Sequence, residues 1–233
     1  GRSILYQTAR YVDIYKALED IARDRTLTPE ERKEMKLYSR LADAFTPLAK
    51  GMNSEYANQN AYDAISVHGG SGFIMEYKCQ RLFRDARIFS IYEGTTQLQV
   101  VAAIRYVTNG TYLGIIKEML EKEVAPEFQA LKERVAKMVE KYEDAINYVK
   151  AAGNNDLHDF LARRLYEMTA EIIMSLLILD DATRAPELFA KSANVYVRYA
   201  EGTVAGHYAY IKEFKAEDLA DFLAAAPEEA PAE

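Results

Sequence analysis

The chain has 233 residues, 49% of them hydrophobic and 28% charged, which predicts one large or two small globular domains. The formal net charge of −7 argues against nucleic acid or an anionic membrane as the main partner. The single cysteine, Cys79, excludes an internal disulfide and is typical of a reducing compartment, and no apolar run approaches the roughly 18 residues of a membrane span.

The first part of the chain has the apolar spacing of helices. Apolar residues at intervals of three and four predict a first helix that ends near Asp24. The run Thr28-Pro29-Glu30-Glu31 then predicts a helix start, in which Thr28 is the N-cap and Glu31 closes a capping box. We expect this second helix to end at Gly51.

A third helix is predicted to end at a glycine pair, Gly69 and Gly70, which suits a left-handed C-cap and a tight turn. A short helix over 78–87 and a longer one over 96–108 follow. The dipeptide Asn109-Gly110 is a strong break signal, so this set of helices is expected to end there.

The character of the sequence changes after Tyr112. Glutamate and lysine become dense between apolar residues, and Pro126 predicts a break within this stretch. The run Gly153-Asn154-Asn155-Asp156 is expected to end one helix and cap the next. The wide apolar face from Leu157 to Leu177 predicts a central helix of a bundle.

The last part of the chain is also predicted to be helical. We expect a turn over 180–183 and a helix over 186–200, with Gly202 and Gly206 loosening the link to a further helical segment. The segment 216–233 has six acidic residues and no basic one, and after Phe222, where it becomes rich in Ala, Pro and Glu, we predict a disordered tail.

No segment shows the alternation of a β-strand, so the predicted fold class is all-α. We expect a helical bundle over 1–112 and a second helical domain over 113–233 that ends in the acidic tail. Because the chain starts without Met and enters a helical pattern directly, we interpret it as the C-terminal piece of a longer protein.

One carboxylate, Glu93, stands between the aromatic-rich segment 88–92 and the start of a helix. Burial in such apolar surroundings raises a carboxyl pKa toward the working pH of a general base. Gly94 leaves room for a substrate to approach the backbone. The alternative interpretation is a helix-capping turn, in which Thr96 is the cap and Gln99 closes the box.

Three motifs occur in order: Ser-Val-His-Gly-Gly-Ser-Gly-Phe (66–73), Arg-Leu-Phe-Arg-Asp-Ala-Arg (81–87) and Ile-Tyr-Glu-Gly-Thr (91–95). In residue identity and spacing they resemble the C-terminal helical domain of the acyl-CoA dehydrogenases. The resemblance is close over 38–106 and loose over 3–27. Beyond Tyr112 the resemblance is limited to the presence of an extra helical domain, which some members of that family carry.

The resemblance implies α,β-dehydrogenation of acyl-CoA thioesters with FAD as the cofactor. It implies that Glu93 is the general base, that the Glu93 backbone N–H helps to bind the thioester oxygen, and that Gly94 borders the acyl-CoA. The positions that match FAD contacts of the family are Thr95, Gln97 and, toward the FAD of a neighbouring subunit, Gly69 and Gly70. Where the family usually has Gln before these glycines, this chain has the shorter Ser66.

We assign the other polar residues either a structural role or no role. Arg84 and Asp85 are expected to form an ion pair or capping pair that holds the loop of Glu93, and Arg105 is assigned no chemistry. The three histidines and Cys79 are scattered without the spacing of metal ligands, so no metal site is predicted.

The resemblance also implies partners and a setting. These are an acyl-CoA substrate, an electron-transferring flavoprotein, a homodimer, fatty acid metabolism, and a cytoplasmic location, or the mitochondrial matrix in a eukaryote. Because the family's other domains are absent from this sequence, the chain alone is expected to be inactive. Two alternatives stay open, namely a fragment of an acyl-CoA oxidase and a non-catalytic helical assembly module.

Overall fold

The computed structural model describes residues 1–222, and every regular element in this range is helical, which confirms the all-α prediction. None of the helices in this range has the length and apolar character that crossing a membrane requires. The α-helices are α1 (Arg2–Asp24), α2 (Pro29–His68), α3 (Gly70–Phe73), α4 (Cys79–Ala86), α5 (Thr96–Thr108), α6 (Thr111–Glu121), α7 (Gln129–Ala151), α8 (Asn155–Arg184) and α9 (Pro186–Glu213). The short 3₁₀ helices are η1 (Arg87–Ser90), η2 (Pro126–Phe128) and η3 (Ala216–Phe222).

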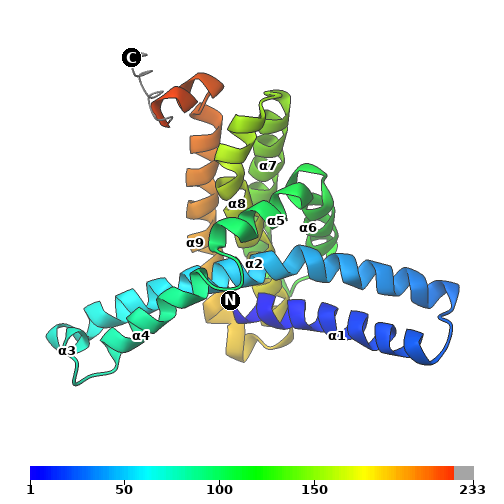
Figure 1. Ribbon diagram of the computed structural model, residues 1–233, viewed down its shortest axis with the longest axis horizontal. Helices are drawn as coiled ribbons and strands as arrows, with labels where there is room; N and C mark the ends of the chain where they lie inside the picture. Colours follow the sequence, from blue (N-terminus) through cyan, green and yellow to red (C-terminus); the bar gives the residue numbers. More distant parts are fainter. Residues whose placement is uncertain (223–233) are drawn as a thin grey trace, which may run out of the picture.

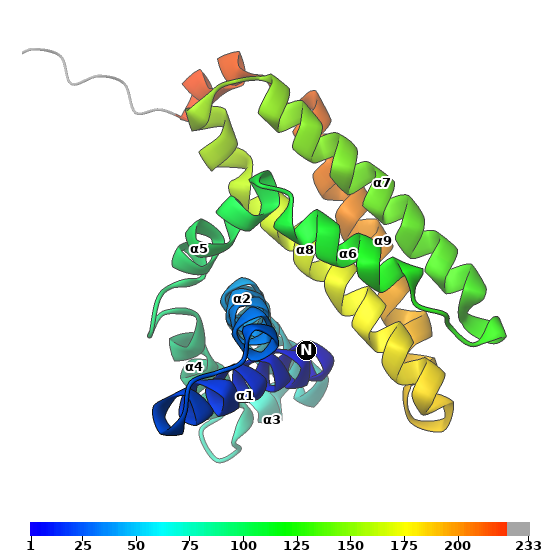
Figure 2. The ribbon, with the colours of Figure 1, turned by 90° about the vertical axis from the view of Figure 1, so that its right-hand side faces the viewer.

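α1 and α2 lie side by side and cross the bundle formed by α7, α8 and α9 (Figure 1, Figure 2). α2 begins as predicted. The Thr28 hydroxyl accepts a hydrogen bond from the Glu31 N–H at 3.1 Å, and the Glu31 carboxylate accepts one from the Thr28 N–H at 2.8 Å. This reciprocal pair is the predicted capping box, and it fixes where the long helix starts.

The predicted helix end at Gly51 is wrong, because α2 continues through Gly51 to His68. A Cβ atom at Gly51 would lie 2.1 Å from the hydroxyl oxygen of Tyr166 on α8. That hydroxyl donates to the carbonyl of Pro47 at 2.9 Å, one turn earlier on α2. The glycine therefore allows α8 to approach α2 closely, and it does not mark a helix end.

The predicted turn over 180–183 is also wrong, because α8 runs on to Arg184. Asp180 pairs with Arg184 one turn later at 3.1 Å, which stabilises the helix where a turn was expected. α8 ends at Arg184, because Pro186 disfavours the helical conformation of the residue before it, Ala185. The run that begins with Gly153 does end α7, and the Asn154 side chain caps α8 by accepting from the Leu157 N–H at 3.0 Å.

α9 is continuous through Gly202 and Gly206, which corrects the predicted break after Ala200. Each glycine costs a helix about 1 kcal/mol relative to alanine. The apolar face of α9 packs against α7 and α8, with Val197 and Val204 fully buried on either side of the first glycine. Burial of this face outweighs the low helix propensity of the glycines.

The last described segment, 216–222, lies directly before the predicted disordered tail and forms η3. The Phe222 ring lies 4.8 Å from the ring of Phe160 and 5.9 Å from that of Phe214, measured between centroids, and this aromatic packing holds the segment. Residues 223–233, to which the prediction of a disordered tail applies, lie outside the described residues.

A single hydrophobic core extends from α1 to α9. α8 packs against α1, α2 and α5, and thereby joins the helices before Asn109 to those after it. Tyr112, at the start of α6, is fully buried and donates to the carbonyl of Ala44 on α2 at 2.5 Å. This hydrogen bond joins the helices before Asn109 to those after it. A buried polar contact therefore adds specificity to their apolar packing.

A buried carboxylate, Glu171, lies between three helices. It accepts hydrogen bonds from the hydroxyls of Tyr56 on α2 at 2.7 Å and of Tyr196 on α9 at 2.6 Å. Burial raises the pKa of the Glu171 carboxyl above its ordinary value of 4.5, despite these two bonds. Folding therefore shifts this group toward its protonated form, relative to the unfolded chain.

Replacing this carboxyl with an amide, Glu171→Gln, is expected to remove a pH dependence of stability. Because the pKa is higher in the folded than in the unfolded chain, the wild-type protein loses stability relative to the variant as pH rises through the folded pKa. Urea unfolding of both proteins from about pH 4 to about pH 7 measures the difference. A difference that does not change with pH would contradict the raised pKa.

Candidate functional site

Glu93 lies in a tight turn over residues 89–94, called here the Glu93 turn, which leads from η1 into α5. Glu93 has a φ of +51°, the one positive φ of a non-glycine residue among residues 1–222, and Gly94 follows with a φ of +91°. A left-handed conformation costs a non-glycine residue about 1–2 kcal/mol. Contacts around the turn must therefore hold Glu93 in place.

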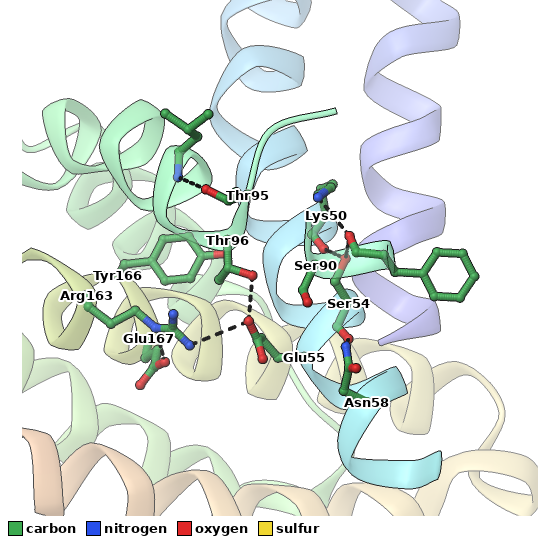
Figure 3. A network of polar contacts seen from close by, with 12 residues as sticks. Lys50, Ser54, Glu55, Asn58, Ser90, Thr95, Thr96, Arg163, Tyr166 and Glu167 are labelled. Atoms are coloured by element: carbon green, nitrogen blue, oxygen red, sulfur yellow. Dashed lines mark hydrogen bonds and ion pairs between the residues drawn. The ribbon is translucent and has the colours of Figure 1, made fainter. Parts of the chain in front are cut away.

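These contacts come from one face of α2 and from α5. Lys50 Nζ donates to the carbonyl of Phe89 at 2.8 Å and to that of Gly94 at 2.6 Å. Ser54, one turn further along α2, donates to the Phe89 carbonyl at 2.9 Å, and Figure 3 shows it and Lys50 directed at the turn. Gln99 Nε2 donates to the Gly94 carbonyl from the other side at 3.2 Å. The two ends of the Glu93 turn are thus fixed to neighbouring helices.

A pocket of about 430 Å³ opens beside Glu93. It lies between α1, α2 and the Glu93 turn, and its lining residues are Leu5, Thr8, Thr46, Ala49, Lys50, Asn53, Ser54, Phe89, Tyr92 and Glu93. The predicted burial of Glu93 is wrong for residues 1–222, because its side chain is exposed there. The neighbours Ile88, Ile91 and Tyr92 are themselves 45–50% exposed, so they do not enclose the carboxylate.

The start of α5 differs in detail from the capping interpretation. Thr95, not Thr96, is the N-cap, and its hydroxyl accepts from the Leu98 N–H at 3.3 Å. The Thr96 hydroxyl instead donates to the Glu55 carboxylate on α2 at 2.5 Å. Arg163 on α8 lies 4.0 Å from the same carboxylate (Figure 3). Capping and a role in binding are compatible here, since the cap lies two residues beyond Glu93.

The residues that match FAD contacts fall in two places. Thr95 and Gln97 are exposed at the start of α5, which contacts Glu55 on α2. Gly69 and Gly70 lie at the far end of α2, where Gly69 caps the helix with a φ of +59° as a glycine cap allows (Figure 1). Fourteen residues at 1.5 Å each place this glycine pair about 20 Å along α2 from Glu55. The structure therefore does not bring the two sets together within one chain.

The predicted pairing of Arg84 with Asp85 is wrong, because Asp85 pairs instead with Arg81 at 3.7 Å, one helical turn earlier. Neighbouring residues on a helix point in different directions, whereas residues four apart share a face. The pair is exposed, so it contributes little to holding the Glu93 turn. Arg105 donates to the hydroxyl of its neighbour Tyr106 at 2.8 Å, which agrees with a structural role. Within residues 1–222 no group of side chains has the arrangement of a metal site.

Lys50 and Ser54 are residues of this site that the sequence alone did not indicate, and Gln99 was expected there only as the closing residue of a capping box. A signal was present in the spacing of Lys50 and Ser54, which are four residues apart and share one face of a helix. The sequence does not say which segment that face contacts.

Replacing Gly94 with alanine is expected to cost about 1–3 kcal/mol of stability, because alanine is strained at a φ of +91° and its Cβ would lie 2.8 Å from Gln99 Nε2. Gly110→Ala is the matched control, since Gly110 has a φ of +80° but a Cβ there meets nothing within 4 Å. Urea unfolding should show the larger loss at Gly94. Equal losses at the two positions would show that the Gln99 contact adds nothing.

Two family models match this chain in succession. The model described as "Acyl-CoA dehydrogenase, C-terminal domain" matches residues 25–107, and the one described as "Acyl-CoA dehydrogenase C terminal" matches residues 108–219. The chain belongs to the acyl-CoA dehydrogenase family. The first match contains both the Glu93 turn and the glycine pair, and the second contains α7, α8 and α9.

Relatives of the acyl-CoA dehydrogenase family cover this chain to different extents. The caffeyl-CoA reductase-Etf complex subunit CarC of Acetobacterium woodii is 50% identical over 52 residues, which are 22% of this chain and 14% of that protein. The butyryl-CoA dehydrogenase of Syntrophomonas wolfei is 28% identical over 196 residues, or 79% of this chain and 30% of that protein. The chain thus spans less than a third of the length of either relative.

A solved structure shares the fold. The crystal structure of an acyl-CoA dehydrogenase complexed with FAD from Bacillus anthracis is similar with a TM-score of 0.65 and 19% sequence identity. The similarity covers 94% of this chain and 40% of that chain. The helical arrangement from α1 to α9 is therefore one that an acyl-CoA dehydrogenase has.

Proposed function

We propose that this chain is the C-terminal part of an FAD-dependent acyl-CoA dehydrogenase in which Glu93 is the general base. The observation that carries the proposal is the Glu93 turn. Glu93 lines a pocket and its backbone is held in a left-handed conformation, with both ends of its turn fixed by side chains. Strained backbone that is held in this way is typical of sites where a side chain must be aimed.

The proposed reaction assigns Glu93 the proton transfer. Its carboxylate removes the proton from the carbon next to the thioester carbonyl. FAD, when bound, supplies the acceptor for the hydride that leaves the next carbon. The Glu93 N–H has no hydrogen-bond partner among residues 1–222, so it is free to donate to the thioester oxygen, where negative charge develops. Gly94 has no side chain that could obstruct the acyl-CoA at this point.

The residues proposed to contact FAD are accessible. A Cβ atom at Gly69 or Gly70 would meet nothing within 4 Å, so the backbone there is open to a bound group. Thr95 and Gln97 are exposed beside the Glu93 turn. The distance of about 20 Å along α2 between the two sets supports contacts with two different FAD molecules of a homodimer. We propose a homodimer on this ground.

The exposure of Glu93 has a consequence for the protein as a whole. A general base for this reaction needs a dry site, and residues 1–222 leave the carboxylate exposed to water. We therefore propose that the acyl-CoA and the rest of a longer chain cover it. The chain alone is then inactive, with residues 1–112 carrying the site and residues 113–233 forming the additional domain.

We further propose that an electron-transferring flavoprotein receives the electrons, in the cytoplasm or the mitochondrial matrix, as part of fatty acid metabolism. Support for this partner comes from the name of the Acetobacterium relative, which is a subunit of an Etf complex. The same name contains "reductase", which favours a second candidate, the reduction of an unsaturated acyl-CoA. Reduced FAD, when bound, would then supply a hydride to the next carbon, and Glu93 would donate to the carbon beside the thioester carbonyl the proton that it removes in the dehydrogenation.

The visible absorption spectrum of the full-length protein tests the proposal. A flavin spectrum that bleaches on addition of acyl-CoAs is expected, and a series of chain lengths identifies the substrate. Bleaching that is reversed by oxygen at every turnover, with oxygen consumption, would favour an acyl-CoA oxidase. A full-length protein that binds no flavin would favour the non-catalytic assembly module and contradict the proposal.

A further inference from the structure

A single ammonium group joins the two ends of the Glu93 turn. Lys50 Nζ donates both to the Phe89 carbonyl, where the turn begins, and to the Gly94 carbonyl, directly after Glu93. We propose that Lys50 is a positioning residue, which sets the direction of the Glu93 carboxylate and of its backbone N–H. This inference rests on the proposed role of Glu93.

The backbone itself does not close this turn. Within residues 1–222 the N–H groups of Glu93 and Gly94 donate to no main-chain carbonyl, and the last main-chain bond before them runs from Tyr92 to Ile88. The span from Phe89 to Gly94 is therefore fixed by side chains. Lys50 makes the shortest of the side-chain bonds to these carbonyls, at 2.6 Å, and is the one group that bonds both.

The chemistry of lysine suits this role. Hydrogen bonds from a charged donor are roughly twice as strong as those between neutral groups, so the pair offsets the strain of the left-handed Glu93. Ser54 shares the Phe89 carbonyl and Gln99 shares the Gly94 carbonyl, but neither spans the turn. Lys50 is anchored on α2, which also packs against α8, so the side chains that hold the turn start from a rigid helix.

The test uses the full-length enzyme and the variant Lys50→Met, which keeps the length of the side chain but donates no hydrogen bond. Misplacement of a reacting group by 1 Å can cost about 10²-fold in rate, so we expect flavin reduction at saturating acyl-CoA to slow by about tenfold or more. The acyl-CoA concentration at half saturation should stay within about twofold, because Lys50 is not proposed to hold the substrate. Lys50→Arg, which keeps charged donors, should recover part of the rate.

The matched control is Lys36→Met, an exposed lysine on the same helix with no polar side-chain contact within residues 1–222. Its rate should equal that of the wild type. A wild-type rate per bound flavin in Lys50→Met would overturn the proposal, even if its melting temperature fell, because a merely structural lysine affects only stability. If Lys50→Met holds no flavin, Lys50→Gln, whose shorter and uncharged side chain cannot replace the ammonium between the two carbonyls, decides by the same measurement, a lower rate supporting the proposal and a wild-type rate overturning it.

Failure of this inference can be distinguished from failure of the proposed function. If the wild type reduces its flavin and Glu93→Gln does not, while Lys50→Met is normal, then only the role of Lys50 is wrong. If Glu93→Gln also reduces its flavin at the wild-type rate, then Glu93 is not the base and the role of Lys50 falls with it.

Discussion

Replacing Glu93 with glutamine in the full-length enzyme is expected to slow flavin reduction by acyl-CoA at least ~10²-fold, the low end of general-base contributions. Glutamine keeps the size and hydrogen-bonding reach of the side chain but cannot take up the proton. The φ of +51° is a property of the backbone, so the turn and the free N–H should persist in the variant. FAD and acyl-CoA are therefore expected to bind nearly as in the wild type.

Stopped-flow absorbance of the flavin measures this rate directly. Glu34→Gln, at an exposed position on α2, is the control and should reduce its flavin normally. The capping interpretation predicts a different outcome for Glu93→Gln, namely a change in stability of about 1 kcal/mol and normal chemistry. A variant that reduces its flavin at the wild-type rate would remove Glu93 from the mechanism.

Replacing Gly51 with alanine is expected to destabilise the chain by about 1–5 kcal/mol. The new Cβ would lie 2.1 Å from the Tyr166 hydroxyl oxygen, so Tyr166 must move and lose its bond to the Pro47 carbonyl. Overpacking and a lost buried hydrogen bond each cost about 1–3 kcal/mol, and the better helix propensity of alanine returns about 1 kcal/mol. Urea unfolding gives the net value.

Two further variants isolate the cause of this loss. Gly114→Ala, at an exposed helical position where a Cβ meets nothing within 4 Å, should stabilise the chain by up to about 1 kcal/mol. In a Tyr166→Phe background the clashing oxygen is absent and Gly51→Ala should cost less, which a double-mutant cycle measures. If Gly51→Ala proves as harmless as Gly114→Ala, then α8 does not approach α2 as closely as the structure has it.

Local signals predicted the helix starts well. The capping box of Thr28 and Glu31 and the cap at Asn154 depend on residues within one turn of each other, so the sequence contains all that decides them. The helix over 96–108 was predicted with the bounds that α5 has. Only the identity of its cap differed, because two adjacent threonines compete for that position.

Glycines and acidic residues within long helices were interpreted wrongly for two different physical reasons. Glycine has poor helix propensity, but both α2 and α9 pack against α8. This packing keeps α2 helical through Gly51 and α9 helical through Gly202. Asp180 and Asp181 were interpreted as part of a turn, but Asp180 pairs with Arg184 within α8 and stabilises the helix there. Local propensity is a weak prior, and at Gly51 a contact with Tyr166, more than 100 residues away along the chain, overrides it.

The candidate site was only partly predictable, also because of contacts between segments far apart in the chain. The motif around Glu93 is continuous in sequence, and it identified the residue, the turn and the family resemblance. Lys50 is 39 residues from Phe89 along the chain, and only the fold brings the two together. The expected burial of Glu93 was inferred from apolar neighbours in sequence, whereas in the structure those side chains are half exposed.

Exchange of the acyl-CoA α-hydrogen with solvent deuterium tests the role of Glu93 most directly, because it reports proton removal separately from hydride transfer. The full-length wild-type enzyme, incubated with acyl-CoA in deuterium oxide, is expected to introduce deuterium at the carbon next to the thioester. Glu93→Gln, with FAD bound, is expected to do so at least ~10²-fold more slowly. Exchange at the wild-type rate in Glu93→Gln would contradict the account, since another group would then be the base.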